Sequence, residues 1–224
     1  FEDEVATLHN VLDTLDYSPD LYDWLHDRRQ DFVKILNKQF PLKSLKKEWD
    51  GAGQLEDRAA LLEKVARLQS KTYQVDAIAF LPSRVVIDTK AHATLQGYII
   101  VNASVLTPSQ PPDIHVKERL LKEDDPAMPL KTVFHEQLHA LFAQLATATH
   151  LGMMPKNHKL HDDAQLQRSK ILYSARVPST LFESYTYQPE ERAVRTQHEL
   201  FLNEFAAPLP TVKDVIKDIF RLKF

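Results

Sequence analysis

The chain contains no cysteine among its 224 residues. This absence excludes disulfide bonds, thiolate-bound zinc and a cysteine nucleophile, so histidine and carboxylate side chains are the strong metal ligands that remain. Glycine is also scarce, with 4 residues against 13 prolines. Few glycines and many prolines favour helices with firm ends over a glycine-rich sheet protein.

No single sign of charge dominates the chain. The 28 lysines and arginines nearly balance the 31 acidic residues, which leaves a net charge of −3. This balance gives no electrostatic reason to expect nucleic acid or an anionic membrane as a main partner. No apolar run reaches the length of a membrane span, and no leader-like segment opens the chain. Because the first residue is Phe1, we expect a mature or trimmed fragment. An exported location is favoured over a cytoplasmic one, and the oligomeric state stays open.

The spacing of apolar residues predicts an α+β fold that is mostly helical. Residues 1–71 have helical periodicity and are expected to form an N-terminal cap or extension, and residues 72–224 a second domain. In that second domain, a small mixed or antiparallel sheet should pack on a long apolar helix over 129–147. Strands are expected over 75–81, 84–88 and 94–102, and further helices over 114–121, 163–175 and 190–205.

The apolar helix over 129–147 contains His135-Glu136-x-x-His139. Residues four apart lie on one face of a helix, so the two imidazoles can reach a single ion. Glu136 can then reach a water molecule held by that ion and act as a general base. A single buried histidine is usually a core residue with a hydrogen-bond partner, but this combination is much rarer. The motif therefore predicts one bound Zn²⁺ per chain.

A catalytic zinc needs a third protein ligand, and the helix that opens with Pro189-Glu190-Glu191 is the best source. Acidic residues are also ordinary at a helix start, because they suit the helix dipole. Periodicity separates the two glutamates. Glu190 shares a face with Val194 and Phe201, which we expect to be buried, whereas Glu191 shares a face expected to be exposed. Because a buried carboxylate needs a cation, Glu190 is preferred over Glu191 as the ligand.

Other residues stay open as the third ligand. Glu183 ranks behind the two glutamates of the helix. A cluster of loop histidines could also bend back towards the motif, although histidines grouped in a loop are more often solvated. These are His150, His158 and His161.

Three segments together resemble the zincin metallopeptidases, and within them the gluzincin-like branch that uses a glutamate ligand and is common among bacterial and phage-encoded domains. They are Tyr98-Ile99-Ile100-Val101-Asn102, His135-Glu136-x-x-His139 and Glu190-x-x-Ala193-x-x-x-Gln197. The resemblance covers residues 72–206. The metzincin pattern does not fit, because Phe142 and Leu145 stand where glycine and histidine would continue it.

The resemblance implies a zinc-dependent metallopeptidase that hydrolyses the peptide bonds of a protein or peptide. Glu136 would take a proton from the attacking water and return it to the leaving amine. Tyr185 is expected to stabilise the oxyanion, with Tyr187 as a second candidate. The strand around Gly97, Tyr98 and Ile99 would bind an extended substrate through backbone hydrogen bonds if it lies at the sheet edge.

Two further functions are carried as alternatives. The first is an amidase or peptidase that acts on cell-wall peptide. The second is a secreted effector or interaction module, in which the N-terminal helices bind a partner and the metal site is not catalytic. The sequence does not indicate the substrate or the cleavage specificity.

Overall fold

The computed structural model describes residues 15–76, 78–90, 96–100, 111–174 and 189–206. The described part is mostly helical with one small sheet, as predicted for an α+β fold. Its helices are α2 (Pro19–Gln39), α3 (Leu42–Gly51), α4 (Leu55–Thr72), α5 (Glu118–Leu121), α6 (Ala127–His150), α7 (His161–Ser174) and α9 (Pro189–Ala206). Its strands are β1 (Val85–Asp88), β2 (Gly97–Tyr98) and β3 (Ile114–Lys117).

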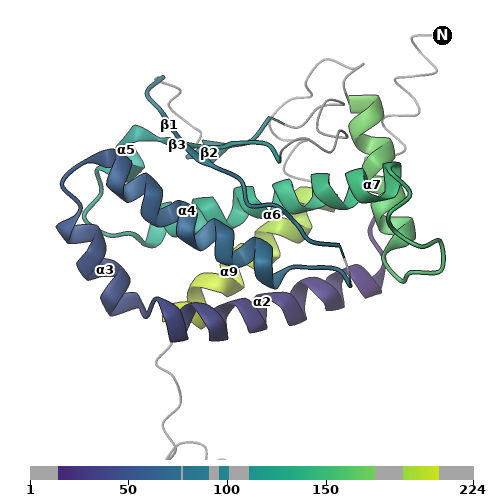
Figure 1. The fold of residues 1–224 in the computed structure, drawn as a ribbon, viewed down its shortest axis with the longest axis horizontal. Helices are drawn as coiled ribbons and strands as arrows, with labels where there is room; N and C mark the ends of the chain where they lie inside the picture. Colours follow the sequence, from purple (N-terminus) through teal and green to yellow (C-terminus); the bar gives the residue numbers. More distant parts are fainter. Residues whose placement is uncertain (1–14, 77, 91–95, 101–110, 175–188, 207–224) are drawn as a thin grey trace, which may run out of the picture.

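Helix α6 is the central element of the fold. It crosses the middle of the molecule, with the sheet along one side and α2 along the opposite side (Figure 1). Most of its residues are buried, as expected for a helix that is apolar on nearly all faces. This confirms the helix predicted over 129–147, and the structure extends it by a few residues at each end.

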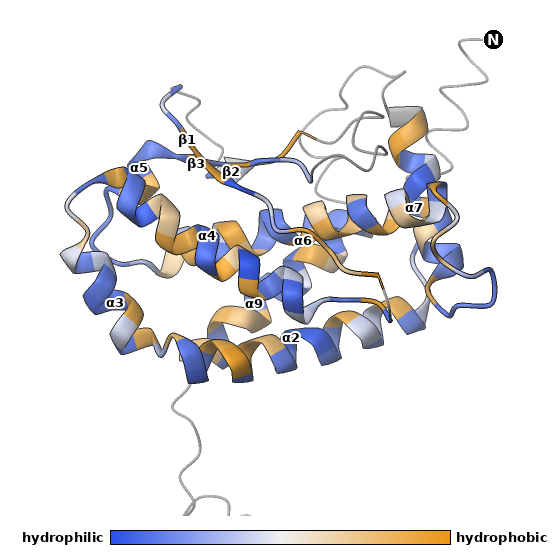
Figure 2. Cartoon of the chain, in the orientation of Figure 1, coloured by the Kyte–Doolittle hydropathy of each residue, from blue (hydrophilic) through white to orange (hydrophobic). Residues whose placement is uncertain are grey.

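An aromatic cluster fixes α9 against α6 and α2. The rings of Phe134 and Phe201 stack with centroids 4.2 Å apart, and Phe32 lies 5.7 Å from each of them. Helix α2 alternates between hydrophilic and hydrophobic residues along its length, as an amphipathic helix at the edge of a core does (Figure 2). Because Phe134 directly precedes His135, this packing also fixes the start of the motif relative to α9.

A buried arginine joins the N-terminal helices to α9. Arg29 of α2 is 1% exposed and forms a paired salt bridge with Glu204, with both nitrogen–oxygen distances at 2.9 Å. Its guanidinium also donates to Oε1 of Gln197. The described helices on both sides of residue 72 thus share one hydrophobic core. The division into 1–71 and 72–224 stays a prediction.

The sheet has the order β1-β3-β2 and is mixed. Strand β3 pairs in parallel with β1 and antiparallel with β2. The helix predicted over 114–121 is therefore wrong in its first half, because residues 114–117 form the central strand and only Glu118–Leu121 is helical. Ile114 and Val116 face the core. The backbone hydrogen-bonding groups of this segment pair with the strands on both sides, whereas in a helix they would pair within the segment.

The strand predicted over 75–81 is not present in the described residues of that segment. Val75 and Ile78 form one isolated bridge, and the chain then runs in irregular structure. Its polar groups are satisfied by α6 instead, because the side-chain amide of Gln144 both accepts from N–H of Leu81 at 2.6 Å and donates to its carbonyl at 2.8 Å. Val75, Ile78 and Phe80 are buried without strand pairing beyond that bridge, whereas Leu81 is exposed.

Gly97 lets strand β2 approach α6 closely. A Cβ placed on Gly97 would lie 2.5 Å from Cγ2 of Thr132, 3.0 Å from the carbonyl oxygen of His115 and 3.5 Å from Cγ of Glu136. The contact of 2.5 Å with Thr132 is too short for a Cβ unless its neighbours shift, so the packing of strand on helix accounts for the glycine. The expected role of Gly97, Tyr98 and Ile99 in substrate binding stays a prediction.

Among the helices that the structure describes, none has the length and apolar content that crossing a membrane requires.

Candidate metal centre

The two histidines of the motif face each other on α6. Nε2 of His135 lies 3.2 Å from Nε2 of His139. One ligand-type atom from each of His135, Glu136 and His139 can be chosen so that all three lie within 4.8 Å of one another. The motif therefore presents two ring nitrogens and a carboxylate to one small volume, as its spacing predicts.

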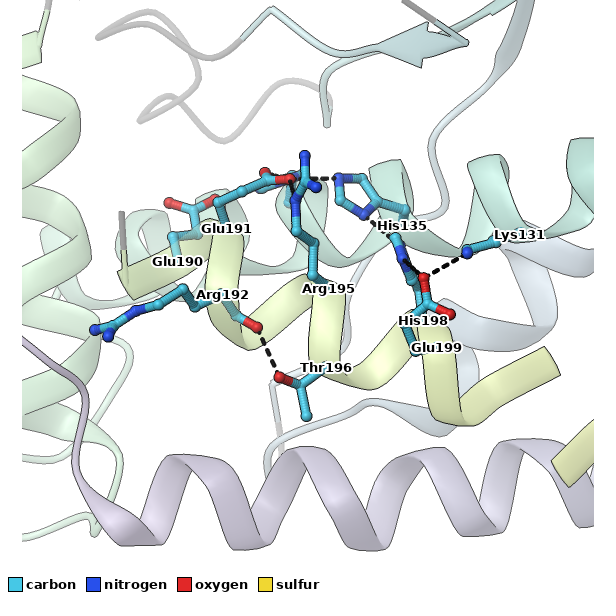
Figure 3. Close-up of polar contacts among 10 residues, drawn as sticks. Lys131, His135, Glu190, Glu191, Arg192, Arg195, Thr196, His198 and Glu199 are labelled. Atoms are coloured by element: carbon cyan, nitrogen blue, oxygen red, sulfur yellow. Dashed lines mark hydrogen bonds and ion pairs between the residues drawn. The ribbon is translucent and has the colours of Figure 1, made fainter. Parts of the chain in front are cut away.

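Glu191 of α9 completes this group from the opposite side (Figure 3). Its Oε2 lies 3.2 Å from Nε2 of His139, and its Oε1 lies 3.6 Å from Nε2 of His135. Oε1 also accepts a hydrogen bond from Nε of Arg195 at 2.5 Å. The side chain of Glu191 is only 2% exposed. The carboxylate is thus buried beside the Nε2 atoms of both imidazoles, where a metal would bind.

The burial of the two glutamates reverses the sequence-based expectation. Glu191 was expected on an exposed face and is buried, whereas the side chain of Glu190 keeps 20% of its surface exposed. Helical periodicity locates the apolar face of α9, which packs on the core through Phe201 and Val194. The flank beside that face looks solvent-exposed in sequence because it is polar, but α6 covers it with the two histidines.

Glu190 contacts the other nitrogen of His139. Its Oε1 lies 2.6 Å from Nδ1 of His139, and its Oε2 accepts from Nε2 of Gln167 at 2.6 Å. Gln167 in turn accepts from the hydroxyl of Tyr17 at 2.6 Å. A carboxylate can only accept, so Nδ1 of His139 carries the proton in this contact. This arrangement leaves Nε2 of His139 directed at Glu191, the orientation that a metal-binding histidine needs.

His135 has its own contacts on the side away from Glu191. Its Nδ1 lies 2.8 Å from Nδ1 of His198, whose Nε2 lies 2.9 Å from Oε1 of Glu199. The same oxygen of Glu199 accepts from Nζ of Lys131 at 2.6 Å. Figure 3 shows these side chains in a row between α6 and α9.

Burial and the crowded charges shift the pKa values of this group. Burial lowers the pKa of His135 to about 4. Burial also opposes charge on His139, but its hydrogen bonds with Glu190 and Glu191 outweigh this effect and raise its pKa. Burial raises the pKa of Glu136 to about 7, with His139 opposing and Glu191 reinforcing the shift.

The pKa values of the outer residues of the group are shifted as well. Burial works against the charge of Glu191, yet the contacts with His135 and His139 outweigh it and lower its pKa. Burial lowers the pKa of His198, and the charge of Lys131 adds to that shift. The hydrogen bond from Lys131 lowers the pKa of Glu199. His198 is therefore held neutral beside an ionised Glu199.

The distances between the donor atoms of His135, His139 and Glu191 fit a zinc ion. Tetrahedral zinc with bonds of about 2.0–2.1 Å holds its nitrogen and oxygen ligands about 3.3–3.4 Å apart. The two Nε2 atoms of His135 and His139 are 3.2 Å apart, Oε2 of Glu191 lies 3.2 Å from Nε2 of His139, and its other oxygen, Oε1, lies 3.6 Å from Nε2 of His135. Two imidazoles and a carboxylate are also a donor set that zinc accepts in catalytic sites. The residues present thus fit the metal.

The loop histidines have partners elsewhere. Nδ1 of His150 accepts from Arg168, Nε2 of His158 lies 3.1 Å from Asp76, and His161 lies 3.2 Å from Asp162. Three other candidates lie outside the described residues, namely Glu183, Tyr185 and Tyr187.

His198 and Gln167 contact this group but were not predicted from the sequence, and the predicted exposure of Glu191 is wrong. One signal could have indicated Glu191. Together with Arg195 and His198 it forms a polar stripe along one flank of α9, at positions that complement the two histidines of α6. No pattern in the sequence indicates Gln167, because its contact with Glu190 joins two helices, α7 and α9, and a local pattern does not report such contacts.

Comparison of the chain with known protein families, with curated proteins and with solved structures finds no match.

Proposed function

We propose that this protein is a zinc-dependent metallopeptidase in which His135, His139 and Glu191 hold the metal. The observation that carries the proposal is the convergence of two imidazoles and one carboxylate: the Nε2 atoms of His135 and His139 are 3.2 Å apart, and each lies 3.2–3.6 Å from an oxygen of Glu191. Glu190 takes a different role in this proposal. It holds the imidazole of His139 from Nδ1 and is not itself a ligand.

When bound to these two imidazoles and the carboxylate, Zn²⁺ would supply Lewis-acid chemistry: it would lower the pKa of a water molecule towards neutrality and polarise a carbonyl group. Glu136 is the residue that handles the proton. Its carboxylate lies beside both histidines, and burial raises its pKa to about 7. A group with a pKa near the working pH can both accept a proton from the attacking water and return it to the leaving amine.

The position of β2 supports an extended peptide as the substrate. Among the described strands β2 lies at an edge of the sheet, because the order is β1-β3-β2. Gly97 also brings this strand against α6, so that a Cβ placed there would lie 3.5 Å from Cγ of Glu136. A peptide that pairs with the free side of such an edge strand gains backbone hydrogen bonds and passes near the proposed base.

Hydrolysis of a mixed peptide library by the purified protein tests the proposal, with cleavage products read by mass spectrometry. We expect cleavage that a chelator abolishes and added zinc restores. A parallel panel of peptidoglycan fragments separates a general peptidase from a cell-wall amidase. Absence of cleavage of every substrate by the zinc-loaded protein would contradict the proposal and favour a non-catalytic metal site.

A further inference from the structure

The two histidines of the metal centre are supported differently on their outer sides. His139 contacts the carboxylate of Glu190, whereas His135 contacts another imidazole, that of His198. A carboxylate beside a metal-binding histidine fixes the ring by accepting a proton from it. A neutral imidazole can donate or accept through a given nitrogen, so its effect on His135 depends on which of its own nitrogens carries the proton.

Glu199 and Lys131, on the other side of His198, decide which nitrogen of His198 carries the proton. Oε1 of Glu199 lies 2.9 Å from Nε2 of His198 and accepts from Lys131 at 2.6 Å. An ionised carboxylate only accepts, so Nε2 of His198 carries its single proton and donates it to Glu199. Nδ1 of His198 is then a bare acceptor. The contact of 2.8 Å between the two Nδ1 atoms therefore requires that His135 donates.

The row of contacts from Lys131 through Glu199 and His198 to His135 begins and ends on α6. Lys131 and His135 are four residues apart on α6, whereas His198 and Glu199 are neighbours on α9. The salt bridge between Lys131 and Glu199 holds the carboxylate in place from the α6 side. Glu199 is therefore fixed relative to His135 as well as to His198.

From this geometry we infer that His198 is a positioning residue of the metal centre. It holds His135 as the tautomer with the proton on Nδ1, so that the lone pair of Nε2 is available to a metal bound between His139 and Glu191. The role of this tautomer in metal binding rests on the proposed function, but the tautomer itself is a property of the metal-free protein.

The tautomer can be measured directly by long-range ¹H–¹⁵N NMR of the metal-free protein at pH 8. We expect His135 of the wild type to carry its proton on Nδ1. His198→Ala removes the acceptor and should shift His135 towards a mixture of tautomers. His198→Asn places an amide oxygen near the former Nδ1 position and should restore the wild-type spectrum. His150→Ala is the matched control. His150 is the last residue of α6 and contacts Arg168, not His135, His198 or Glu199.

Zinc affinity gives the second readout. We expect His198→Ala to raise the dissociation constant for zinc by about 10- to 100-fold, as loss of an outer-shell partner does. His198→Asn should stay close to the wild type, and His150→Ala should not change the affinity. A variant that loses thermal stability but keeps the wild-type tautomer and zinc affinity would overturn the inference and leave His198 a packing residue.

The metallopeptidase proposal and the positioning role of His198 can be contradicted independently. If His198→Ala changes the tautomer but no form of the protein binds zinc, the positioning role stands and the metallopeptidase proposal fails. If the wild type binds zinc and cleaves peptides but His198→Ala changes neither tautomer nor affinity, the positioning role alone is overturned.

Discussion

Nε2 of His139 lies 3.2 Å from the carboxylate of Glu191, and that carboxylate is buried between α6 and α9. Its neighbour Glu190 contacts the opposite nitrogen of the same ring at 2.6 Å. Two consecutive glutamates thus enclose one imidazole. We propose that they have different roles: Glu191 is a metal ligand, and Glu190 fixes the ring of His139.

Removal of Glu190 tests this division of roles. In Glu190→Ala, His139 loses its Nδ1 partner and Gln167 loses an acceptor, but the three proposed ligands remain. We expect the zinc dissociation constant, measured by competition with a chromophoric chelator, to rise by about 10- to 100-fold. Full zinc occupancy should return at high zinc concentration. Loss of binding at every zinc concentration would instead identify Glu190 as a ligand.

Substitution of the proposed base separates chemistry from metal binding. Glu136→Gln keeps the size of the side chain but cannot accept the proton of the attacking water. We expect kcat for a cleaved peptide to fall by at least about 100-fold, in line with the contribution of general base catalysis. The zinc content per chain should equal that of the wild type. Full retention of activity in this variant would contradict the assigned mechanism.

The close approach of β2 to α6 predicts a stability effect at Gly97. In Gly97→Ala the new methyl group would meet Cγ2 of Thr132 at 2.5 Å, which forces strand and helix apart. We expect urea denaturation to show a loss of about 1–3 kcal/mol in the free energy of unfolding.

Two further variants identify that contact as the cause. The control Gly53→Ala should be nearly neutral, because nothing lies within 4 Å of a Cβ at that position. Addition of Thr132→Ser to Gly97→Ala removes Cγ2 and should recover part of the loss. An unchanged stability in Gly97→Ala would mean that the strand does not lie against the helix in this way.

The salt bridge between Asp88 and Lys117 predicts a response to acid. Nζ of Lys117 donates to Asp88 at 2.5 Å, and this bond, with one from the backbone of Lys90, lowers the pKa of Asp88 from 3.8 to about 2. Because the folded-state pKa is the lower one, the stabilisation is complete above about pH 5 and is lost as the pH falls towards 2.

Comparison with Asp88→Asn isolates this contribution. At pH 5 the variant should be less stable than the wild type, because it leaves the buried Lys117 without its carboxylate. The denaturation midpoints of the two proteins should converge as the pH approaches 2. A difference that stays constant from pH 5 to pH 2 would show that the pair does not have the lowered pKa.

The sequence predicted the long helices and the proximity of His135, Glu136 and His139 because these depend on local patterns. The spacing of His135 and His139 places both rings on one face wherever the helix lies. The apolar run of α6 likewise predicts its burial. These features needed no knowledge of the tertiary fold.

The misassigned features depend on contacts between distant segments. Residues 114–117 form a strand because β1 and β2 pair with them on either side, and no local pattern reports those neighbours. Leu81 is held by the amide of Gln144 rather than by a strand partner. Glu191 is buried because two histidines cover a polar flank. Periodicity finds apolar faces, but it cannot distinguish a polar face in water from one that meets polar partners.

Zinc stoichiometry tests the central claim most directly. Elemental analysis of the protein, equilibrated with zinc and freed of excess metal, should give one zinc per chain for the wild type. The same measurement on Glu191→Ala should give no stoichiometric zinc, because the buried carboxylate is one of the three ligands. One zinc per chain in Glu191→Ala, or none in the wild type, would contradict the account.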